Sequence, residues 1–283
     1  KRFNDNISTL LFAHASQNQL STDENEDSFL DSPLKTQYNV FNRWHYRIKN
    51  KAEGQFGVRV LMEERIGGQT NEHLDDTLSQ NHYNIAINSK QLEAFTKNGF
   101  LFPDKPWKSI AITTTERYHK QNAMFVNKKY EGEQKSLYVN TIWQDILNTT
   151  FHKIKFGGSF MLDDYKETFN DGEIAIGDSA HNTQEMIPGG YAEYTFNNDT
   201  TLSVVSGLRA DYFDDLGLMV NPRVHLKYNP SKESVILLSG GRGMRTSHIF
   251  VENSSVFASS REIIIQEKLA PEIAWNYGMT FTY

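Results

Sequence analysis

Charged side chains recur at every second position in several stretches of the sequence. Arg209 and Asp211 form one such pair, and Arg223, His225 and Lys227 form a longer series. Because successive side chains of a β-strand point to opposite faces, this spacing collects the charges on one face. Such a basic face could attract an anionic small molecule such as a metal chelate, or its residues could pair with each other. The candidate binding residues are Arg209, Asp211, Arg223, His225, Lys227, Arg242, Arg245, Glu252 and Asn253.

Residue patterns for metal binding and catalysis are weak. The histidines considered lie far apart without a short ligand spacing, so we expect no metal site and no cofactor. The acidic pairs could take part in acid–base chemistry, but no nucleophile and base accompany them, and we expect solvated strand ends. We therefore expect no catalytic residues and no enzyme activity. The residues considered are His14, His45, His152 and His225 for a metal, and Asp163–Asp164 and Asp214–Asp215 for catalysis.

The elements that would position these side chains are long strands with a period of two. In the stretch 201–212, Leu202, Val204, Leu208, Ala210 and Tyr212 alternate with the polar residues. We expect about twelve strands of about ten to fourteen residues, longer than the five or six residues usual in soluble sheets. A strand that crosses a bilayer needs about nine to eleven residues. The polar face is expected to carry Arg43, Arg47, Arg59, Lys153, Lys155, Arg209, Arg223, Lys227 and Arg242, with the acids Glu63, Asp163, Glu193 and Asp211.

Short turns and long loops alternate between these strands. Outer-membrane barrels have this order because tight turns lie on the periplasmic rim and extended loops on the extracellular rim. The sequence therefore favours an all-β, antiparallel transmembrane β-barrel with long extracellular loops. Short turns are expected near 50–51, 147–150, 197–200 and 229–233, and long loops at 17–34, 66–82, 165–186, 214–219 and 243–271.

Composition excludes several other classes. The chain of 283 residues has no cysteine, which rules out disulfides and thiolate chemistry. Its net charge of -6 and lack of a basic cluster argue against nucleic acid as a partner. The mean hydropathy of -0.57 is compatible with a membrane barrel, because alternate residues alone face lipid. The chain opens without the apolar core of a signal peptide, so we expect the N-terminus of the exported protein to lie upstream.

From about residue 95 onward the sequence resembles TonB-dependent outer-membrane receptors. The segments that carry the resemblance include 130–138, 187–194, 207–212, 221–230, 240–245 and 271–278. The resemblance implies a barrel of about 22 strands around a plugged lumen. About twelve strands cannot close such a cylinder, so we interpret residues 1–283 as a partial transmembrane barrel. The plug domain, the energy-coupling box and the remaining strands are expected outside this chain.

The resemblance also implies location in the outer membrane and uptake of a scarce nutrient. Siderophores, haem, cobalamin or other metal complexes are the implied substrates, with the TonB complex and outer-membrane lipid as partners. The basic face would then meet the substrate path or the plug. The alternative is a porin-type or adhesin-like barrel without energised transport.

The segment 243–271 is unusually apolar for a solvated loop. It contains Ile249–Asn253 and Glu262–Ile265, each with several large aliphatic side chains. We predict that this loop folds inward or over the lumen and helps to contact the substrate.

Overall fold

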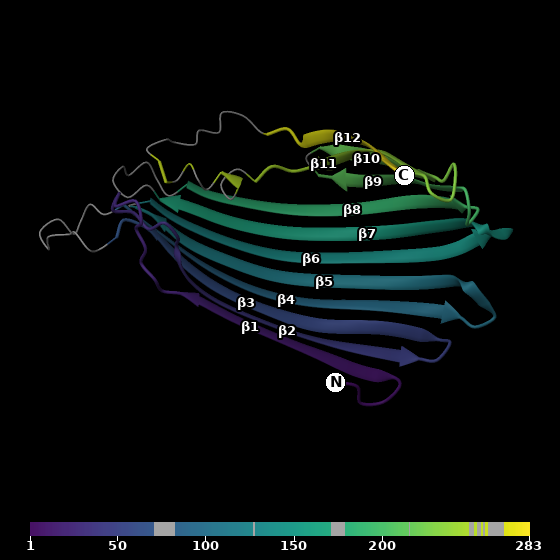
Figure 1. The fold of residues 1–283 in the computed structure, drawn as a ribbon, viewed down its shortest axis with the longest axis horizontal. Helices are drawn as coiled ribbons and strands as arrows, with labels where there is room; N and C mark the ends of the chain where they lie inside the picture. Colours follow the sequence, from purple (N-terminus) through teal and green to yellow (C-terminus); the bar gives the residue numbers. More distant parts are fainter. Residues whose placement is uncertain are drawn as a thin grey trace, which may run out of the picture.

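The computed structural model describes residues 1–70, 83–126, 128–170, 179–214, 216–248, 252–253, 256, 258–259 and 269–283. It contains one antiparallel sheet of twelve strands in sequence order (Figure 1). This confirms the predicted fold class and strand number. The strands are β1 (Ile7–Asn18), β2 (Leu34–Ile48), β3 (Ala52–Gly68), β4 (Asn84–Phe102), β5 (Lys105–Phe125), β6 (Lys128–Leu147), β7 (Thr149–Asn170), β8 (Ser179–Asn197), β9 (Leu202–Phe213), β10 (Gly217–Tyr228), β11 (Val235–Arg245) and β12 (Glu272–Thr282).

The alternation of side chains gives the sheet two unlike faces. Directly paired residues share a face, and Val224 pairs with Ser206 while Arg223 pairs with Gly207. One face, here called outward, carries an apolar row in which Leu208 and Val224 are 54% and 45% exposed. The opposite face, here called inward, carries the charged residues. Apolar side chains left exposed in long rows on one face are what a lipid-facing barrel wall requires.

The central strands are longer than predicted, because β3 to β8 have 17 to 22 residues. Their ends near the long loops are charged even on the outward face. Glu133 and Lys135 form an ion pair there, with 3.0 Å between the carboxylate and the ammonium. Because charges on the lipid face are costly within the hydrocarbon layer, these ends extend beyond it.

The connections lie as the loop order predicted, with three exceptions. Long connections gather at one end of the strands and tight turns at the other (Figure 1). The exceptions are a tight turn between β5 and β6, where Val126 has a φ of 60°, and an unpredicted turn at 103–104 between β4 and β5. The third is the connection at 214–216 between β9 and β10, which is short where a long loop was predicted at 214–219. Two predicted long loops, 66–82 and 165–186, are partly β-strand in the structure. Their central parts, 71–82 and 171–178, lie outside the described residues.

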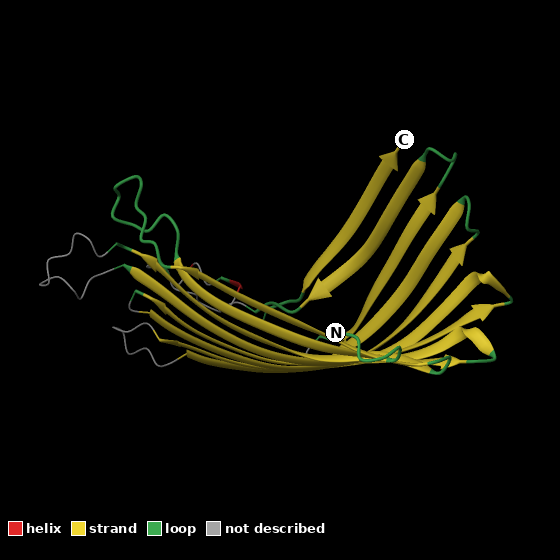
Figure 2. Ribbon diagram, turned by 60° about the horizontal axis from the view of Figure 1, so that its bottom comes forward, coloured by secondary structure: helices red, strands yellow, loops and turns green. Residues whose placement is uncertain are grey.

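The sheet is open and strongly curved. Among the described strands, β1 and β12 each pair with one neighbour, and the outer edge of β1 is met only at its start, by a bridge between Arg2 and Ser8. Figure 2 shows that the strands near the C-terminus rise away from the rest, so that the sheet bends; the concave side of this bend is here called the trough. Because the wall is a single layer, few hydrophobic residues are buried in the described part of the chain: Ala52, Ala123, Phe125, Tyr130 and Ile187. No helix in the described part of the chain is long and apolar enough to cross a membrane.

Candidate functional site

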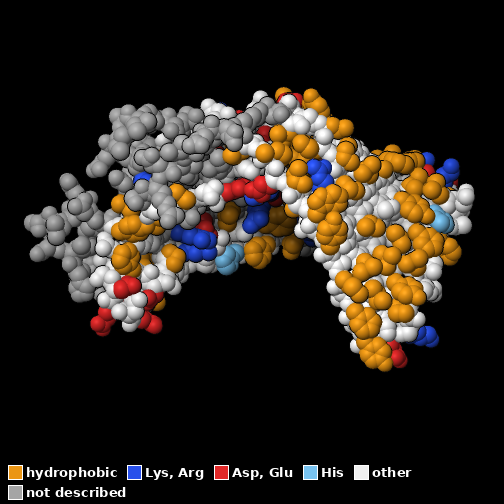
Figure 3. Space-filling view, turned by 90° about the horizontal axis from the view of Figure 1, so that it is seen from above, with side chains coloured by type: hydrophobic (Ala, Val, Ile, Leu, Met, Phe, Trp, Pro, Cys, Tyr) orange, Lys and Arg blue, Asp and Glu red, His pale blue; other side chains and the backbone are white. Residues whose placement is uncertain are grey.

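A polar hollow of about 560 Å³ lies on the inward face over β6 to β11. Figure 3 shows acidic, basic and histidine side chains gathered in a recess between two arms of the molecule. The hollow therefore brings together residues from six strands, which span more than a hundred positions in the sequence. Its lining residues are Tyr138, Asn140, Ile142, Lys155, Tyr191, Ala192, Glu193, Gly207, Leu208, Arg209, Asp211, Asn221, Arg223, Arg242, Gly243 and Met244.

Glycines on the inward face make room for these charged side chains. A Cβ atom on Gly207 would lie 3.1 Å from the Arg223 Nε atom, and one on Gly241 would lie 3.3 Å from the Arg223 Cβ atom. A Cβ atom on Gly189 would collide with the Asp211 carboxylate. The side chains of Arg223 and Asp211 therefore lie flat across neighbouring strands, which a larger residue at the glycine positions would prevent.

Two groups of ion pairs order the hollow. The Glu193 carboxylate accepts a hydrogen bond from the Lys155 ammonium at 2.8 Å and one from the Arg223 guanidinium at 2.7 Å. The Arg209 guanidinium donates to Asp211 at 2.7 Å and to the Ser159 hydroxyl at 2.8 Å. Charge-assisted bonds of this kind fix the geometry of both partners. The sequence left open whether the charged residues pair with each other. The structure shows that Lys155, Arg209 and Arg223 do pair, with the acids Glu193 and Asp211 of the same wall.

The paired charges are not equally accessible. The carboxylates of Glu193 and Asp211 are 12% and 9% exposed, whereas the side chains of Lys155, Arg209 and Arg223 are 37%, 37% and 57% exposed. The acids thus lie beneath the cations. With Arg242, the hollow has four cations against two carboxylates, which leaves two positive charges. A surface of this kind attracts anions even though most of its cations are paired.

The nine predicted site residues fall into three groups along the inward face. Arg209, Asp211, Arg223 and Arg242 line the hollow. His225 and Lys227 lie further along β10 in a separate hollow of about 380 Å³, nearer the short turns. The remaining three, Arg245, Glu252 and Asn253, lie at the rim with the long loops. The sequence thus predicted one site where the structure separates three.

Arg242 was expected on the polar row, and the strand register corrects this. Arg223 pairs with Gly241, so Gly241 is inward, and Arg242 pairs with Trp275 in the apolar row. The hydrogen-bonded pairing between β10 and β11 ends at Arg223 and Gly241. The Arg242 guanidinium instead donates to the backbone carbonyl of Val220 and reaches the edge of the hollow. It therefore satisfies a carbonyl that would otherwise lack a strand partner.

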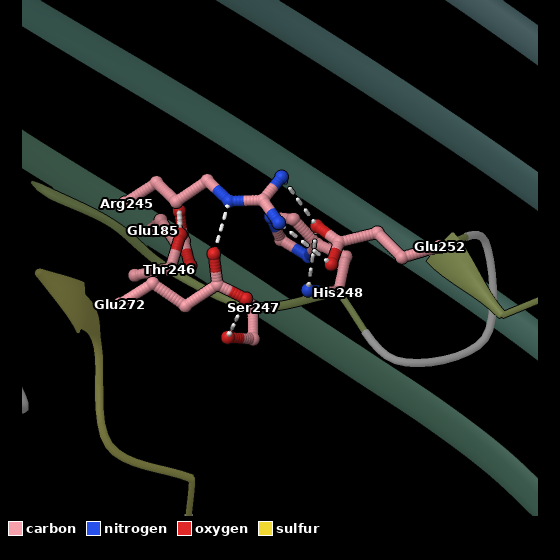
Figure 4. A network of polar contacts seen from close by, with 7 residues as sticks. All are labelled: Glu185, Arg245, Thr246, Ser247, His248, Glu252 and Glu272. Atoms are coloured by element: carbon pink, nitrogen blue, oxygen red, sulfur yellow. Dashed lines mark hydrogen bonds and ion pairs between the residues drawn. The ribbon is translucent and has the colours of Figure 1, made fainter. Parts of the chain in front are cut away.

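Arg245 is the centre of a polar network at the rim (Figure 4). Its guanidinium lies 2.7 Å from the Glu272 carboxylate and 3.1 Å from that of Glu252. The adjacent Thr246 hydroxyl donates to Glu185 on β8 at 3.2 Å. Asn253 follows Glu252, and its carbonyl accepts a hydrogen bond from the Val256 amide. This network ties the start of the β11–β12 loop to β12 and β8.

The far part of the same loop crosses the inward face. The Tyr83 hydroxyl donates to the Ala258 carbonyl at 2.6 Å, and the Lys128 ammonium donates to the Ser259 carbonyl at 2.8 Å. Tyr83 precedes β4 and Lys128 begins β6, so the loop reaches strands on the opposite side of the trough. The predicted inward fold is confirmed for these residues, and substrate contact stays a prediction. Residues 249–251 and 262–265 lie outside the described part of the chain.

Asp163 lies on the inward face as its alternation predicted, but the expectation that it forms a solvated strand end with Asp164 was wrong. It is 6% exposed and accepts hydrogen bonds from Ser136 and Gln134 of β6. Sequence reasoning missed this cluster because the alternation in 128–147 was not followed. Asp215 of the second pair lies outside the described residues.

The comparisons with known proteins agree with this architecture. A family model described as "TonB dependent receptor-like, beta-barrel" matches residues 3–283. The chain therefore belongs to the family of TonB-dependent receptor β-barrels, whose members are outer-membrane proteins. The comparison with curated protein sequences finds no match.

Solved siderophore receptors share the fold. The siderophore receptor PirA from Acinetobacter baumannii is similar with a TM-score of 0.67 at 12% identity, over 87% of this chain and 39% of that one. A mutant ferric enterobactin receptor PfeA from Pseudomonas aeruginosa, in complex with enterobactin, gives 0.67 at 10% identity, over 88% and 41%. The alcaligin receptor FauA from Bordetella pertussis gives 0.62 at 10%, over 86% and 39%. The chain thus spans about two fifths of the length of these receptors.

Proposed function

We propose that this chain is part of the wall of an energised importer that takes up a scarce nutrient as an anionic metal complex. The carrying observation is the hollow over β6 to β11, in which exposed cations lie above buried acids. An anionic chelate that enters from the long-loop side would meet Arg223 and Arg209 at the surface. The wall supplies binding and orientation, and no covalent step is proposed.

The remaining parts of the importer are proposed to lie outside this chain. The open order of the twelve strands and the coverage of two fifths of the similar receptors support a larger barrel of about 22 strands around a plug domain. Energy would come from the TonB complex acting through that plug. Substrates of the similar receptors include enterobactin, so a ferric siderophore is the first class to test.

The test compares two cationic positions on one strand in the full-length receptor. Arg223 and Lys227 both face inward on β10, but Arg223 alone lines the larger hollow. We expect Arg223→Gln to slow uptake of radioactive ferric enterobactin about tenfold, because a hydrogen bond to a charged group contributes about 1.5–3 kcal/mol. Lys227→Gln is the matched control and should retain most uptake. Equal uptake by Arg223→Gln and the unmodified receptor would reject the role of the hollow.

A second arm separates the importer from a porin-type barrel. Uptake of ferric enterobactin is measured in the same cells with and without TonB. Uptake of neutral cobalamin is measured as the comparison. Uptake that stops without TonB supports an energised importer. Uptake that continues at the same rate without TonB supports a porin-type barrel. Cell-surface binding of protein ligands without uptake of any complex would instead support an adhesin.

A further inference from the structure

A second cluster on the inward face combines phenol, imidazole and carboxylate groups. His119 of β5, Tyr130 of β6, and Tyr165 and Glu167 of β7 line one small hollow of about 60 Å³. The strand register explains their proximity, because His119 pairs with Gln134 and Gln134 pairs with Tyr165. The cluster lies nearer the long loops than the basic hollow and shares no residue with it.

The Tyr130 hydroxyl and the Glu167 carboxylate are held side by side within this cluster. Tyr130 is 3% exposed and Glu167 is 5% exposed, and the hydroxyl donates to the carboxylate at 2.7 Å. Tyr130 reaches this position by passing over Gly132, the direct partner of Glu167. A Cβ atom on Gly132 would lie 2.5 Å from the Tyr130 oxygen. The absence of a side chain at this position therefore places two oxygen donors next to each other.

The charge of Glu167 is not balanced within the described residues. Among them, Glu167 receives one hydrogen bond, from the neutral Tyr130 hydroxyl, and has no ion pair. An ionised carboxylate that is removed from water is costly unless a cation or further hydrogen bonds compensate it. Because the hollow adjoins this carboxylate, a cation in the hollow would supply the missing charge.

We propose that this hollow is a binding site for ferric iron, with Tyr130, Tyr165, Glu167 and His119 as ligands. Hard oxygen donors suit a trivalent cation, and a tyrosine oxygen is an established ligand of haem iron. The described histidine and acidic residues alone form no cluster of three that could hold a metal, and the two phenols raise this set to four donors. Iron stays ferric throughout, and each phenol that binds it as phenolate releases one proton to solvent.

Gln134 would orient one of these ligands. Its side-chain amide donates to the Tyr165 oxygen at 2.8 Å and to Asp163 at 3.2 Å. A donor aimed at the tyrosine oxygen favours the phenolate form and fixes the direction of its lone pairs. The site would accept iron from a weak carboxylate chelate near the mouth of the trough. It stands independently of the proposed transport through the basic hollow.

The test uses the full-length receptor purified in detergent, with ferric nitrilotriacetate as the probe. After removal of unbound iron, we expect about one tightly held iron per receptor and a visible phenolate-to-iron absorption band. Tyr130→Phe should lose most of the bound iron and weaken the band. Tyr212→Phe is the control, because Tyr212 lies in the outward row of β9, paired with Leu218, and does not line this hollow. This variant should bind iron as the unmodified receptor does.

Two outcomes would overturn the proposal: no band in the unmodified receptor, or the same band and iron content in Tyr130→Phe. If Tyr130→Phe does not fold, as judged by heat-modifiable gel mobility, Tyr165→Phe takes its place and must shift or weaken the band. Ferric enterobactin uptake is measured in the same variants. Loss of the iron band with normal uptake supports the site and leaves the importer proposal intact, so failure of one is distinguishable from failure of the other.

Discussion

The ring of Tyr191 on β8 lies across the backbone of Gly157, its direct partner on β7. The Tyr191 hydroxyl reaches β6, where it donates to the Thr141 carbonyl at 3.3 Å and to the Asn140 side chain at 3.2 Å. Arg209 of β9 lies above the same ring, with 6.0 Å between the guanidinium carbon and the ring centre. One aromatic side chain therefore joins four neighbouring strands at the floor of the hollow.

This contact makes Gly157 sensitive to a single added methyl group. A Cβ atom at this position would collide with the Tyr191 ring and lie 2.5 Å from the Thr141 carbonyl oxygen. We expect Gly157→Ala to lower the free energy of unfolding by about 1–3 kcal/mol, as overpacking does elsewhere. The measurement is urea unfolding of the full-length receptor. Gly158→Ala is the control, because its nearest contact would be an ordinary 3.6 Å. Equal unfolding midpoints for the two variants would contradict this account.

The two faces of β10 should differ in their tolerance of charge. Val224 belongs to the outward row and His225 to the inward row of the same strand. We expect Val224→Arg to destabilise the folded receptor in lipid vesicles by about 2–4 kcal/mol, because the guanidinium would enter hydrocarbon. His225→Arg should cost much less, since it faces the trough. Folding into vesicles, followed by gel mobility against urea, measures both. A larger loss from His225→Arg would reverse the assignment of the faces.

The crossing of the β11–β12 loop can be tested by a disulfide, because the chain contains no cysteine. Ala258 of the loop packs against a buried cluster on β5 and β6 that includes Ala123. We expect Ala123→Cys with Ala258→Cys to form a disulfide under mild oxidation, detected as a gel mobility shift that reductant reverses.

The control for the disulfide places the first cysteine at Ala111 instead of Ala123, on the same strand and face. Ala111 is twelve residues away, which corresponds to roughly 40 Å along a strand. The pair Ala111→Cys with Ala258→Cys should stay reduced. Cross-linking of both pairs to the same extent would mean that the loop has no fixed position over the trough.

The sequence determined the fold class because a period of two survives in single stretches of the chain. The face of the sheet on which Val204, Arg209 or Val224 lies follows from its position along the strand, since neighbouring side chains point in opposite directions. Strand lengths were less predictable. The outward side of β5 and β6 becomes charged beyond the membrane, so the alternation fades there although the backbone ladder continues.

The candidate site was predicted in part. Arg209, Asp211 and Arg223 were expected together and line one hollow, whereas His225 and Lys227 of the same row lie in another. Arg242 reaches the edge of the hollow although its strand position is in the apolar row, because the register of β11 against β10 and β12 is a property of paired strands. Asp163 was taken for a solvated end because its partners come from β6.

Periodicity therefore determined which face a side chain takes, and tertiary structure decided which side chains meet on that face. Strand pairing alone brings Lys155, Glu193 and Arg223 within ion-pair distance. Hydrogen bonding between strands sets their register, and a shift of one residue would move each side chain to the other face. The loop that reaches from β11 to Tyr83 and Lys128 depends on the curvature of the whole sheet, which no local stretch of sequence encodes.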